Sequence, residues 1–207
     1  MIKNIIFDLG AVLLNIDFKK TIEAFRKLGI TNIDELFSEY SQKEFFDSFE
    51  KGLITPQQFR AEIRKYLQNI LADEDIDDAW NGMILYFPIE NINLLISLKS
   101  KYRTFLLSNT NETHYIFYNK ILQTQFKIDN LSNLFEKAYY SHKLGLRKPD
   151  KEIFNLVLKE NNLIQEETLF IDDNPRNIAT ASTLGINTVL LKPPKILLKV
   201  LHEKELI

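Results

Sequence analysis

The clearest pattern along the chain is a series of short apolar runs that end in polar residues. The first run, Ile5-Ile6-Phe7, is followed at once by the acid Asp8. Continuous runs of this kind, rich in β-branched and aromatic residues, are typical of strands buried on both faces of a parallel sheet. We predict strands in five segments: 3–9, 103–109, 137–142, 168–173 and 187–192.

The segments that follow these runs have the spacing of amphipathic helices, with apolar residues three and four positions apart. An alternation of strand and helix is typical of a parallel sheet with helices on both faces. The sequence therefore predicts an α/β fold with a Rossmann-like parallel sheet core. We expect the core helices in residues 88–102, 111–123, 150–162 and 175–185.

The long stretch between the first strand and the second contains no convincing strand and is expected to be helical. One helix should end at Gly29, and another should begin with Thr55 as its N-cap and Pro56 at its first position. The expected helices cover residues 17–29, 32–40 and 55–68.

These helices are inserted directly after Asp8, which has a consequence for function. In open α/β sheets, ligands bind outside the carboxyl ends of the strands, so an insertion at that edge would cover the ligand site as a lid. We therefore predict a core formed by residues 1–15 and 88–207 and an inserted α-helical cap formed by residues 16–87.

The composition of the chain mainly excludes other classes of protein, partner and site. The chain has 207 residues, 45% hydrophobic and 26% charged, which suits one globular core with a sizeable insertion. Its formal net charge of -2 argues against nucleic acid and membrane partners, and the lack of cysteine excludes disulfides and zinc-thiolate sites. The first ten residues lack the features of a signal peptide, so a cytoplasmic location is expected. No feature predicts an oligomeric state.

Polar residues stand at the ends of four predicted strands. Because the carboxyl ends of parallel strands lie at one edge of a sheet, we expect these side chains to converge. Separately, each could be a helix cap, a turn residue or a solvated loop residue; their joint order favours a site. The residues are Asp8 after the first strand, Ser108 and Asn109 after the second, Lys148 after the third, and Asp172 and Asp173 after the fourth.

Such a cluster suits a divalent cation and a phosphoryl group. Carboxylates crowded in one cleft repel each other unless a cation neutralises them, and an all-oxygen site with waters suits Mg²⁺. Lys148 would balance the remaining negative charge, while Ser108 and Asn109 would donate to phosphoryl oxygens. One oxygen of Asp8 would bind the metal and the other would attack phosphorus, giving an aspartyl phosphate that water hydrolyses.

Four segments, FDLGAVLLN, LLSNTN, GLRKPD and FIDDNPRNIATASTLGI, resemble in order and spacing the four motifs of the haloacid dehalogenase (HAD) superfamily. The helical insertion resembles the type 1 cap of its subfamily IA, and the chain is similar to a bacterial group that includes α-D-glucose-1-phosphate phosphatase. The resemblance implies a phosphatase that hydrolyses a small phosphate ester, with a sugar phosphate as the expected substrate, Asp8 as nucleophile and Mg²⁺ as cofactor. It also implies phosphate contacts from Ser108, Asn109 and Lys148, and metal contacts from Asp173 first and Asp172 second.

One departure from the family pattern concerns Gly10. Most phosphatases of the superfamily have a second aspartate at this position, which acts as general acid and then as general base. Gly10 would still offer the metal its backbone carbonyl, but it cannot carry a proton. The usual contribution of such a group is about 10²- to 10⁴-fold, so we expect a preference for leaving groups of low pKa.

Several alternatives stay open on the sequence alone. His114 is a candidate substitute acid, although a solvated or capping role suits its place early in a helix better. The chain could also be a phosphate-binding regulatory protein without turnover, or a metal-free 2-haloacid dehalogenase, a reading that the adjacent acids disfavour. Aromatic residues of the cap either pack its helices or stack on a sugar: Phe45, Phe46, Phe49 and Trp80.

Overall fold

The computed structural model of the chain describes residues 1–30, 44–66, 71–192 and 196–207. Its centre is a sheet of five parallel strands in the order β5-β4-β1-β6-β7. Every strand predicted for the core is present, and the α/β fold with a Rossmann-like core is confirmed. The strands are β1 (Asn4–Phe7), β4 (Arg103–Ser108), β5 (Lys137–Tyr140), β6 (Thr168–Asp172) and β7 (Asn187–Leu190).

Strand β1 lies in the middle of the sheet, paired with β4 on one side and β6 on the other. Its residues alternate between the two faces, because Ile5 and Phe7 belong to one hydrophobic cluster and Ile6 belongs to the other. All three side chains are fully buried. Burial on both faces explains why the sequence has a continuous apolar run here. The central strand also delivers Asp8 to the middle of the carboxyl edge.

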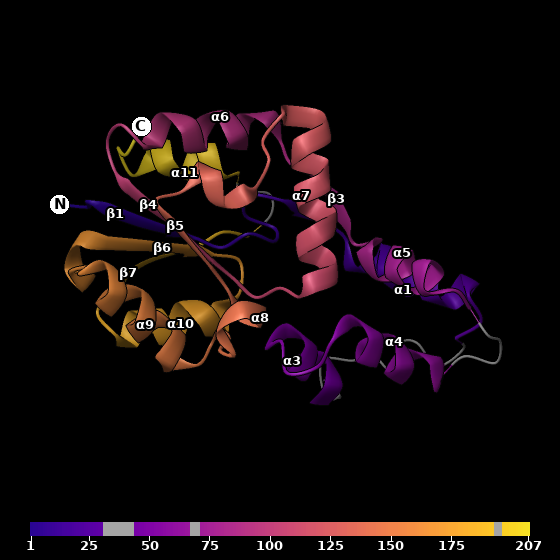
Figure 1. Cartoon of the computed structure of the whole chain (residues 1–207). Helices are drawn as coiled ribbons and strands as arrows, with labels where there is room; N and C mark the ends of the chain where they lie inside the picture. The colour runs from indigo at the N-terminus through magenta and orange to yellow at the C-terminus, as the bar shows by residue number, and fades with distance from the viewer. Residues whose placement is uncertain (31–43, 67–70, 193–195) are drawn as a thin grey trace.

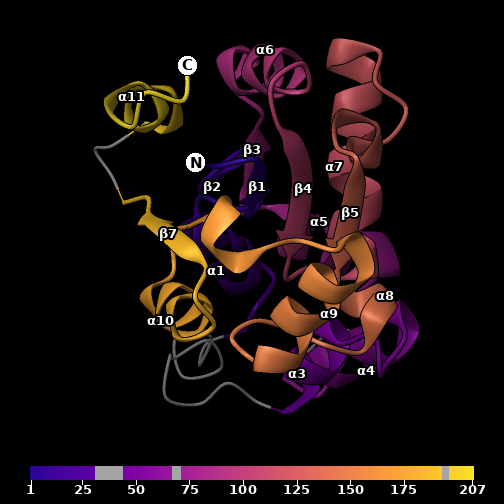
Figure 2. The ribbon, with the colours of Figure 1, turned by 90° about the vertical axis from the view of Figure 1, so that its left-hand side faces the viewer.

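Helices form a layer on each face of the sheet. Figure 1 shows α6 and α11 on one face and α9 and α10 on the other, and Figure 2 shows the same layers after a quarter turn. The helices predicted for the core are all present. The core helices are α6 (Ile89–Leu98), α7 (Glu112–Phe126), α8 (Ser141–Leu144), α9 (Lys151–Asn161), α10 (Pro175–Thr183) and α11 (Leu197–Glu203), with the 3₁₀ helices η1 (Leu131–Leu134) and η2 (Gln165–Glu167).

The described part of residues 16–87, called the helical insertion below, lies beyond the carboxyl ends of the strands (Figure 1). Helix α4 begins as predicted, because Thr55 and Gln58 cap each other's backbone N–H groups at 2.8 and 3.2 Å. The helix expected over 32–40 falls outside the described residues. The helices are α1 (Phe18–Lys27), α3 (Glu44–Glu50), α4 (Pro56–Arg64) and α5 (Asp73–Asn81).

The helical insertion also contains strands, so the expectation of a stretch without them is wrong. Strands β2 (Asn15–Ile16) and β3 (Ile84–Tyr86) pair with each other in antiparallel orientation. With two and three residues, they are too short to reveal a strand period in the sequence. The pair joins the place where the chain leaves the core to the place where it returns.

A cluster of aromatic rings holds the helices of the insertion together. Phe59 of α4 is fully buried and stacks on Phe49 of α3, with ring centroids 4.3 Å apart. Phe59 also lies 5.0 Å from Trp80 of α5 and 5.8 Å from Phe45 and Phe46. Phe45 and Phe49 thus pack the helices, whereas Phe46 and Trp80 also line a cavity described below.

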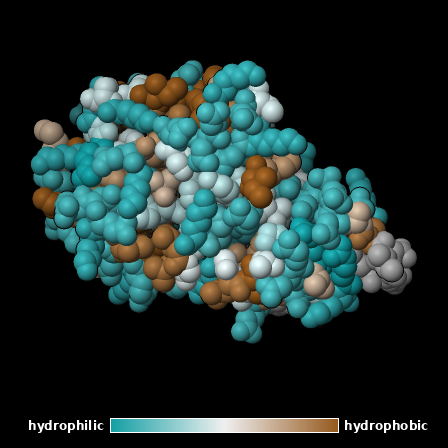
Figure 3. Space-filling view, in the orientation of Figure 1, coloured by the Kyte–Doolittle hydropathy of each residue, from teal (hydrophilic) through white to brown (hydrophobic). Residues whose placement is uncertain are grey.

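The face of the molecule seen in Figure 3 is mostly hydrophilic, and its hydrophobic side chains gather in small separate patches. None of the helices in the described ranges combines the length and the apolar character that a bilayer crossing requires. The cytoplasmic location and the absence of nucleic acid and membrane partners stay predictions.

We expect the Phe59→Ala substitution to destabilise the protein strongly, because it removes the ring that joins α3, α4 and α5. Truncation of a fully buried phenylalanine costs about 3–5 kcal/mol of the free energy of unfolding. Urea denaturation followed by tryptophan fluorescence would report this loss, since Trp80 adjoins the ring. The control is Leu53→Ala, at a residue that is 67% exposed, with an expected change within about 0.5 kcal/mol.

Candidate active site

Asp8 follows β1 directly at the carboxyl edge of the sheet. Its backbone N–H donates to the carbonyl of Ile171 in β6 at 2.9 Å, so the pairing of the strands extends to this residue and fixes it. Asp172 ends β6, and Asp173 comes next. One carboxylate oxygen from each of these three acids lies within 4.8 Å of the others. Neighbouring strands therefore bring the predicted acids together.

Lys148 enters this acidic cluster from the loop that follows α8. Its side chain is 1% exposed, and its Nζ lies 2.6 Å from Asp8 Oδ1 and 2.7 Å from Asp172 Oδ2. Asn109 holds the lysine backbone, because its Oδ1 accepts from the Lys148 N–H and its Nδ2 donates to the Lys148 carbonyl, each at 2.9 Å. Asn109 therefore positions Lys148. Its role as a phosphate donor stays a prediction.

The two adjacent acids have different surroundings. Asp172 is fully buried, and besides Lys148 its carboxylate accepts from the Asn174 N–H at 2.7 Å and from Asn177 Nδ2 at 3.0 and 3.1 Å. Asp173 is half-buried, and no other described residue donates to its carboxylate. A cation binds most readily to oxygens whose lone pairs are free. Asp173 is thus better suited to direct metal contact, and Asp172 to anchoring Lys148.

Burial and charge shift the pKa values at this site. Burial raises the pKa of Asp8 to about 7, the Lys148 ammonium opposes the shift, and Asp172 and Asp173 add to it. Burial also raises the pKa of Asp173. For Lys148, burial lowers the pKa, but Asp8 and Asp172 outweigh burial and raise it. One ammonium thus faces three acids, and this excess of negative charge on oxygen ligands fits Mg²⁺.

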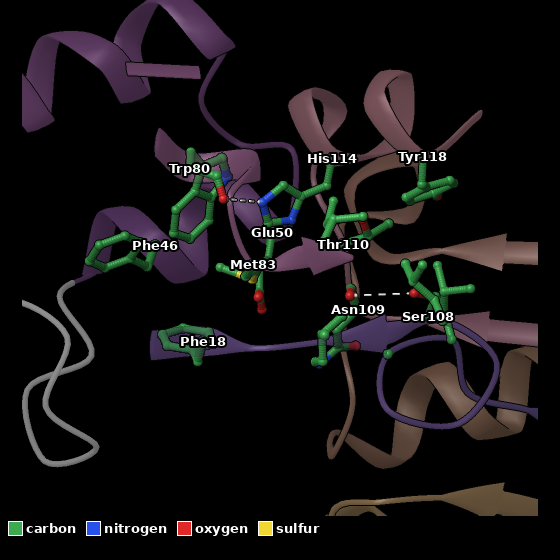
Figure 4. A pocket seen from close by; sticks show the side chains of 15 residues that line it. Phe18, Phe46, Glu50, Trp80, Met83, Ser108, Asn109, Thr110, His114 and Tyr118 are labelled. Carbon is green, nitrogen blue, oxygen red and sulfur yellow. Dashed lines mark hydrogen bonds between the residues drawn. The ribbon is translucent and has the colours of Figure 1, made fainter. Parts of the chain in front are cut away.

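A cavity of about 220 Å³ opens beside the end of β4. Ser108 and Asn109 border it from the core, and Gly10 borders it from the loop after Asp8. The Ser108 side chain is buried and lies at the strand end as predicted. The cavity is smaller than the roughly 300–1,000 Å³ typical of pockets for drug-sized ligands. It therefore suits a small ligand. Aromatic rings from Phe18, Phe46 and Trp80 form part of its wall (Figure 4).

His114 lies in the wall of the cavity with both ring nitrogens in contact with polar groups. Its Nε2 lies 3.1 Å from the Trp80 carbonyl, and its Nδ1 lies 3.1 Å from Asn111 Nδ2. A carbonyl only accepts and an amide nitrogen only donates, so the ring is neutral with its proton on Nε2. Burial lowers its pKa to about 4. The ring is half-buried, stacks on Trp80 and contacts the side chain of Asn111, the N-cap of α7, so it has no proton to spare for a substrate.

Two charged residues that the sequence analysis did not single out lie at this site. Arg147 forms ion pairs with Asp47 and Glu50 of α3, and its Nη2 lies 2.9 Å from Glu50 Oε2. The sequence offered a hint for Arg147, because it directly precedes Lys148. The sequence offered no such hint for Glu50. In the segment FDSFEKG, an acid that follows aromatic residues is typical of a solvated helix end.

Comparison with known proteins identifies the family. A family model described as haloacid dehalogenase-like hydrolase matches residues 5–191. The chain belongs to this family. The family resemblance stated from the four motifs is therefore confirmed for this HAD hydrolase, whereas its subfamily and cap type stay predictions.

Relatives and solved structures cover nearly the whole HAD hydrolase. A D-ribitol-5-phosphate phosphatase from Bacteroides thetaiotaomicron is 33% identical over 190 residues, which are 91% of each chain. An aspartate-to-alanine variant of a HAD family enzyme from the same species, in complex with magnesium and inorganic phosphate, is 38% identical with a TM-score of 0.89, covering 94% of this chain and 96% of that one. A predicted HAD-like hydrolase from Porphyromonas gingivalis is 32% identical with a TM-score of 0.89, covering 99% and 98%.

We expect Lys148→Met to destabilise the metal-free protein by about 3–5 kcal/mol at pH 8, because it leaves buried acids without their ammonium. The loss should shrink at pH 5.5. Asp8 then lacks the group that opposes its raised pKa, so the native state binds more protons than the unfolded state and gains stability as the pH falls.

Urea denaturation in excess chelator at the two pH values measures this difference. The control is Lys151→Met, at an exposed lysine that begins α9. A loss for Lys148→Met that is the same at both pH values would contradict the electrostatic account.

Proposed function

We propose that this HAD hydrolase is a Mg²⁺-dependent phosphatase that hydrolyses a small phosphate ester, with Asp8 as the nucleophile. The observation that carries the proposal is the contact of Lys148 Nζ with both Asp8 and Asp172, beside Asp173. The positive charges of one ammonium and one divalent cation balance the negative charges of three carboxylates, so a phosphate dianion can approach the site. Similarity to a D-ribitol-5-phosphate phosphatase and to an enzyme holding magnesium and phosphate supports this assignment.

Asp8, Asp173 and the backbone carbonyl of Gly10 would hold the metal, with Asp172 close by. When bound, Mg²⁺ screens the negative charge of the phosphoryl group and of the acids around it. Lys148 binds Asp8 Oδ1 and fixes the orientation of that carboxylate. Ser108 and Asn109 stand at the end of the neighbouring strand, where they would donate to phosphoryl oxygens.

The reaction proceeds by attack of an Asp8 carboxylate oxygen on phosphorus. The bond from phosphorus to the leaving oxygen breaks, and Asp8 becomes an aspartyl phosphate. Water then attacks the same phosphorus and returns Asp8 to its carboxylate form. Lys148 keeps its charge through both steps, because the neighbouring carboxylates raise its pKa.

The helical insertion acts as the cap in this proposal, with residues 16–87 as its bounds. The cavity of about 220 Å³ lies between this insertion and the core and leaves room for a small leaving group such as a sugar or a polyol. We therefore propose a phosphorylated sugar or sugar alcohol as the substrate class. Of the four cap aromatics considered from the sequence, Phe46 and Trp80 line the cavity.

We expect Asp8→Asn to reduce kcat by several orders of magnitude while the fold survives, because the amide keeps the shape of the side chain but cannot attack phosphorus. Release of inorganic phosphate from a panel of sugar, polyol, nucleotide and acyl phosphates is the measurement. The control is Asp129→Asn, at an exposed acid outside the site. A tenth of the wild-type rate in the Asp8 variant would exclude the covalent mechanism, and no release by the wild type would favour a binding protein.

Removal of the metal should abolish activity, and Mg²⁺ should restore it. Calorimetric titration of Mg²⁺ into Asp173→Asn should show weaker binding without loss of stability, since Asp173 receives no hydrogen bond from other described residues. Asp172→Asn should instead lower stability as well, because Asp172 anchors Lys148. Full activity in excess chelator would favour the metal-free dehalogenase reading.

A further inference from the structure

Cleavage of a phosphate ester of an alcohol needs a proton on the departing oxygen, because an alkoxide is a poor leaving group. Gly10, beside the nucleophile, has no side chain to supply one. Among the described residues that line the cavity, the titratable ones are Glu50, His114 and Tyr118. His114 is neutral, and both of its ring nitrogens contact polar groups of the protein. Tyr118 is buried, and burial raises its pKa well above the ordinary value.

Glu50 is the only carboxylic acid among these three residues, and it reaches the cavity from the helical insertion. It comes from the last turn of α3, and Figure 4 shows its side chain pointing into the cavity. The side chain is 30% exposed, so a ligand in the cavity can reach it. Its one described cationic contact is Arg147, whose Nη2 lies 2.9 Å from Oε2. Arg147 also pairs with Asp47, so one guanidinium serves two carboxylates and negative charge is in excess.

These surroundings raise the pKa of Glu50 above that of a carboxyl group in water. Burial raises its pKa, Arg147 opposes the shift, Asp47 adds to it, and Lys148 opposes it. A phosphate dianion bound beside Ser108 and Asn109 would add a further negative charge next to the cavity. Binding of the substrate would therefore raise the pKa of Glu50 further at the moment when a proton is needed.

We propose that Glu50 is the general acid and general base of this HAD hydrolase, delivering the proton that position 10 cannot supply. The assignment rests on the proposed phosphatase function. As Asp8 bonds to phosphorus and the bond to the leaving oxygen breaks, the Glu50 proton moves to that oxygen and an alcohol departs. The Glu50 carboxylate then takes a proton from the water that attacks phospho-Asp8, which releases phosphate and restores the acid.

This assignment reverses the leaving-group preference expected from Gly10 alone. With a proton donor in place, kcat/KM depends only weakly on the pKa of the leaving group, so phosphates of simple alcohols are substrates. The substrate class thus includes primary alkyl phosphates of small polyols, and acidic leaving groups have no special advantage.

The test compares p-nitrophenyl phosphate, whose phenol leaves without a proton, with benzyl phosphate, which has a similar ring but an alkoxide leaving group. We expect the wild type to cleave both with kcat/KM values within about tenfold of each other. Glu50→Gln should lose about 10²- to 10⁴-fold on benzyl phosphate and less than about tenfold on the aryl ester. The control, Asp47→Asn, removes the other acid from Arg147 and should affect both substrates equally and by less than about tenfold.

Two further readouts separate proton transfer from a structural role. In Glu50→Gln, p-nitrophenyl phosphate should give a burst of about one phenol per enzyme followed by slow turnover, because phospho-Asp8 forms but lacks its base. In the wild type, kcat/KM for benzyl phosphate should fall as the pH rises and Glu50 loses its proton, and this decline should be absent from the variant. The charged groups that face Glu50 in this titration are Arg147, Asp47 and Lys148.

The possible results distinguish the two proposals. A wild type that releases phosphate neither from these esters nor from any member of the sugar, polyol, nucleotide and acyl phosphate panel would overturn the phosphatase function itself. A wild type that cleaves p-nitrophenyl phosphate and strongly disfavours benzyl phosphate would leave the phosphatase intact and exclude Glu50 as the acid. Equal losses on both esters in Glu50→Gln, without a burst, would assign Glu50 a structural role and overturn the inference.

Discussion

The contact of the Lys148 ammonium with Asp8 and Asp172 is the interaction on which the rest of the site depends. Desolvation of an isolated charge costs several kcal/mol even after relaxation, so none of these groups could occupy its position alone. The ammonium joins the loop after α8 to the ends of β1 and β6. It therefore fixes the geometry of the nucleophile, and the excess negative charge that remains creates a need for a cation.

The same loop also connects the core to the helical insertion. Lys148 points into the sheet edge, while its neighbour Arg147 pairs with two acids of α3. Asn109 holds the backbone of Lys148 from the end of β4, so the position of this loop is determined by the core. The ion pairs of Arg147 thus align α3 against a part of the molecule that the active site itself keeps in place.

The sequence predicted the features that follow a repeating physical rule. The five strands could be recognised because burial on both faces demands continuous apolar runs, as in β1, and the acids could be grouped because parallel strands end at one edge. Pairs that form only in three dimensions were not predictable. Three examples join residues far apart in the sequence, at separations that follow no period: the pairing of β2 with β3, the contact of His114 Nε2 with the Trp80 carbonyl, and the approach of Glu50 to Arg147.

Location on the insertion gives Glu50 a property that an aspartate at position 10 would lack. A carboxyl group beside the nucleophile stays in the core whether or not the cavity is covered. Glu50 is carried by α3, so in the proposed mechanism it reaches the leaving oxygen only while the insertion lies over the cavity. Proton transfer then takes place only while the insertion covers the cavity and excludes bulk water. The aspartyl phosphate likewise forms only where Glu50, the base for its hydrolysis, is present. A substrate too large for that arrangement would lose its proton donor as well as its fit, so size selection and acid catalysis would depend on the same helix.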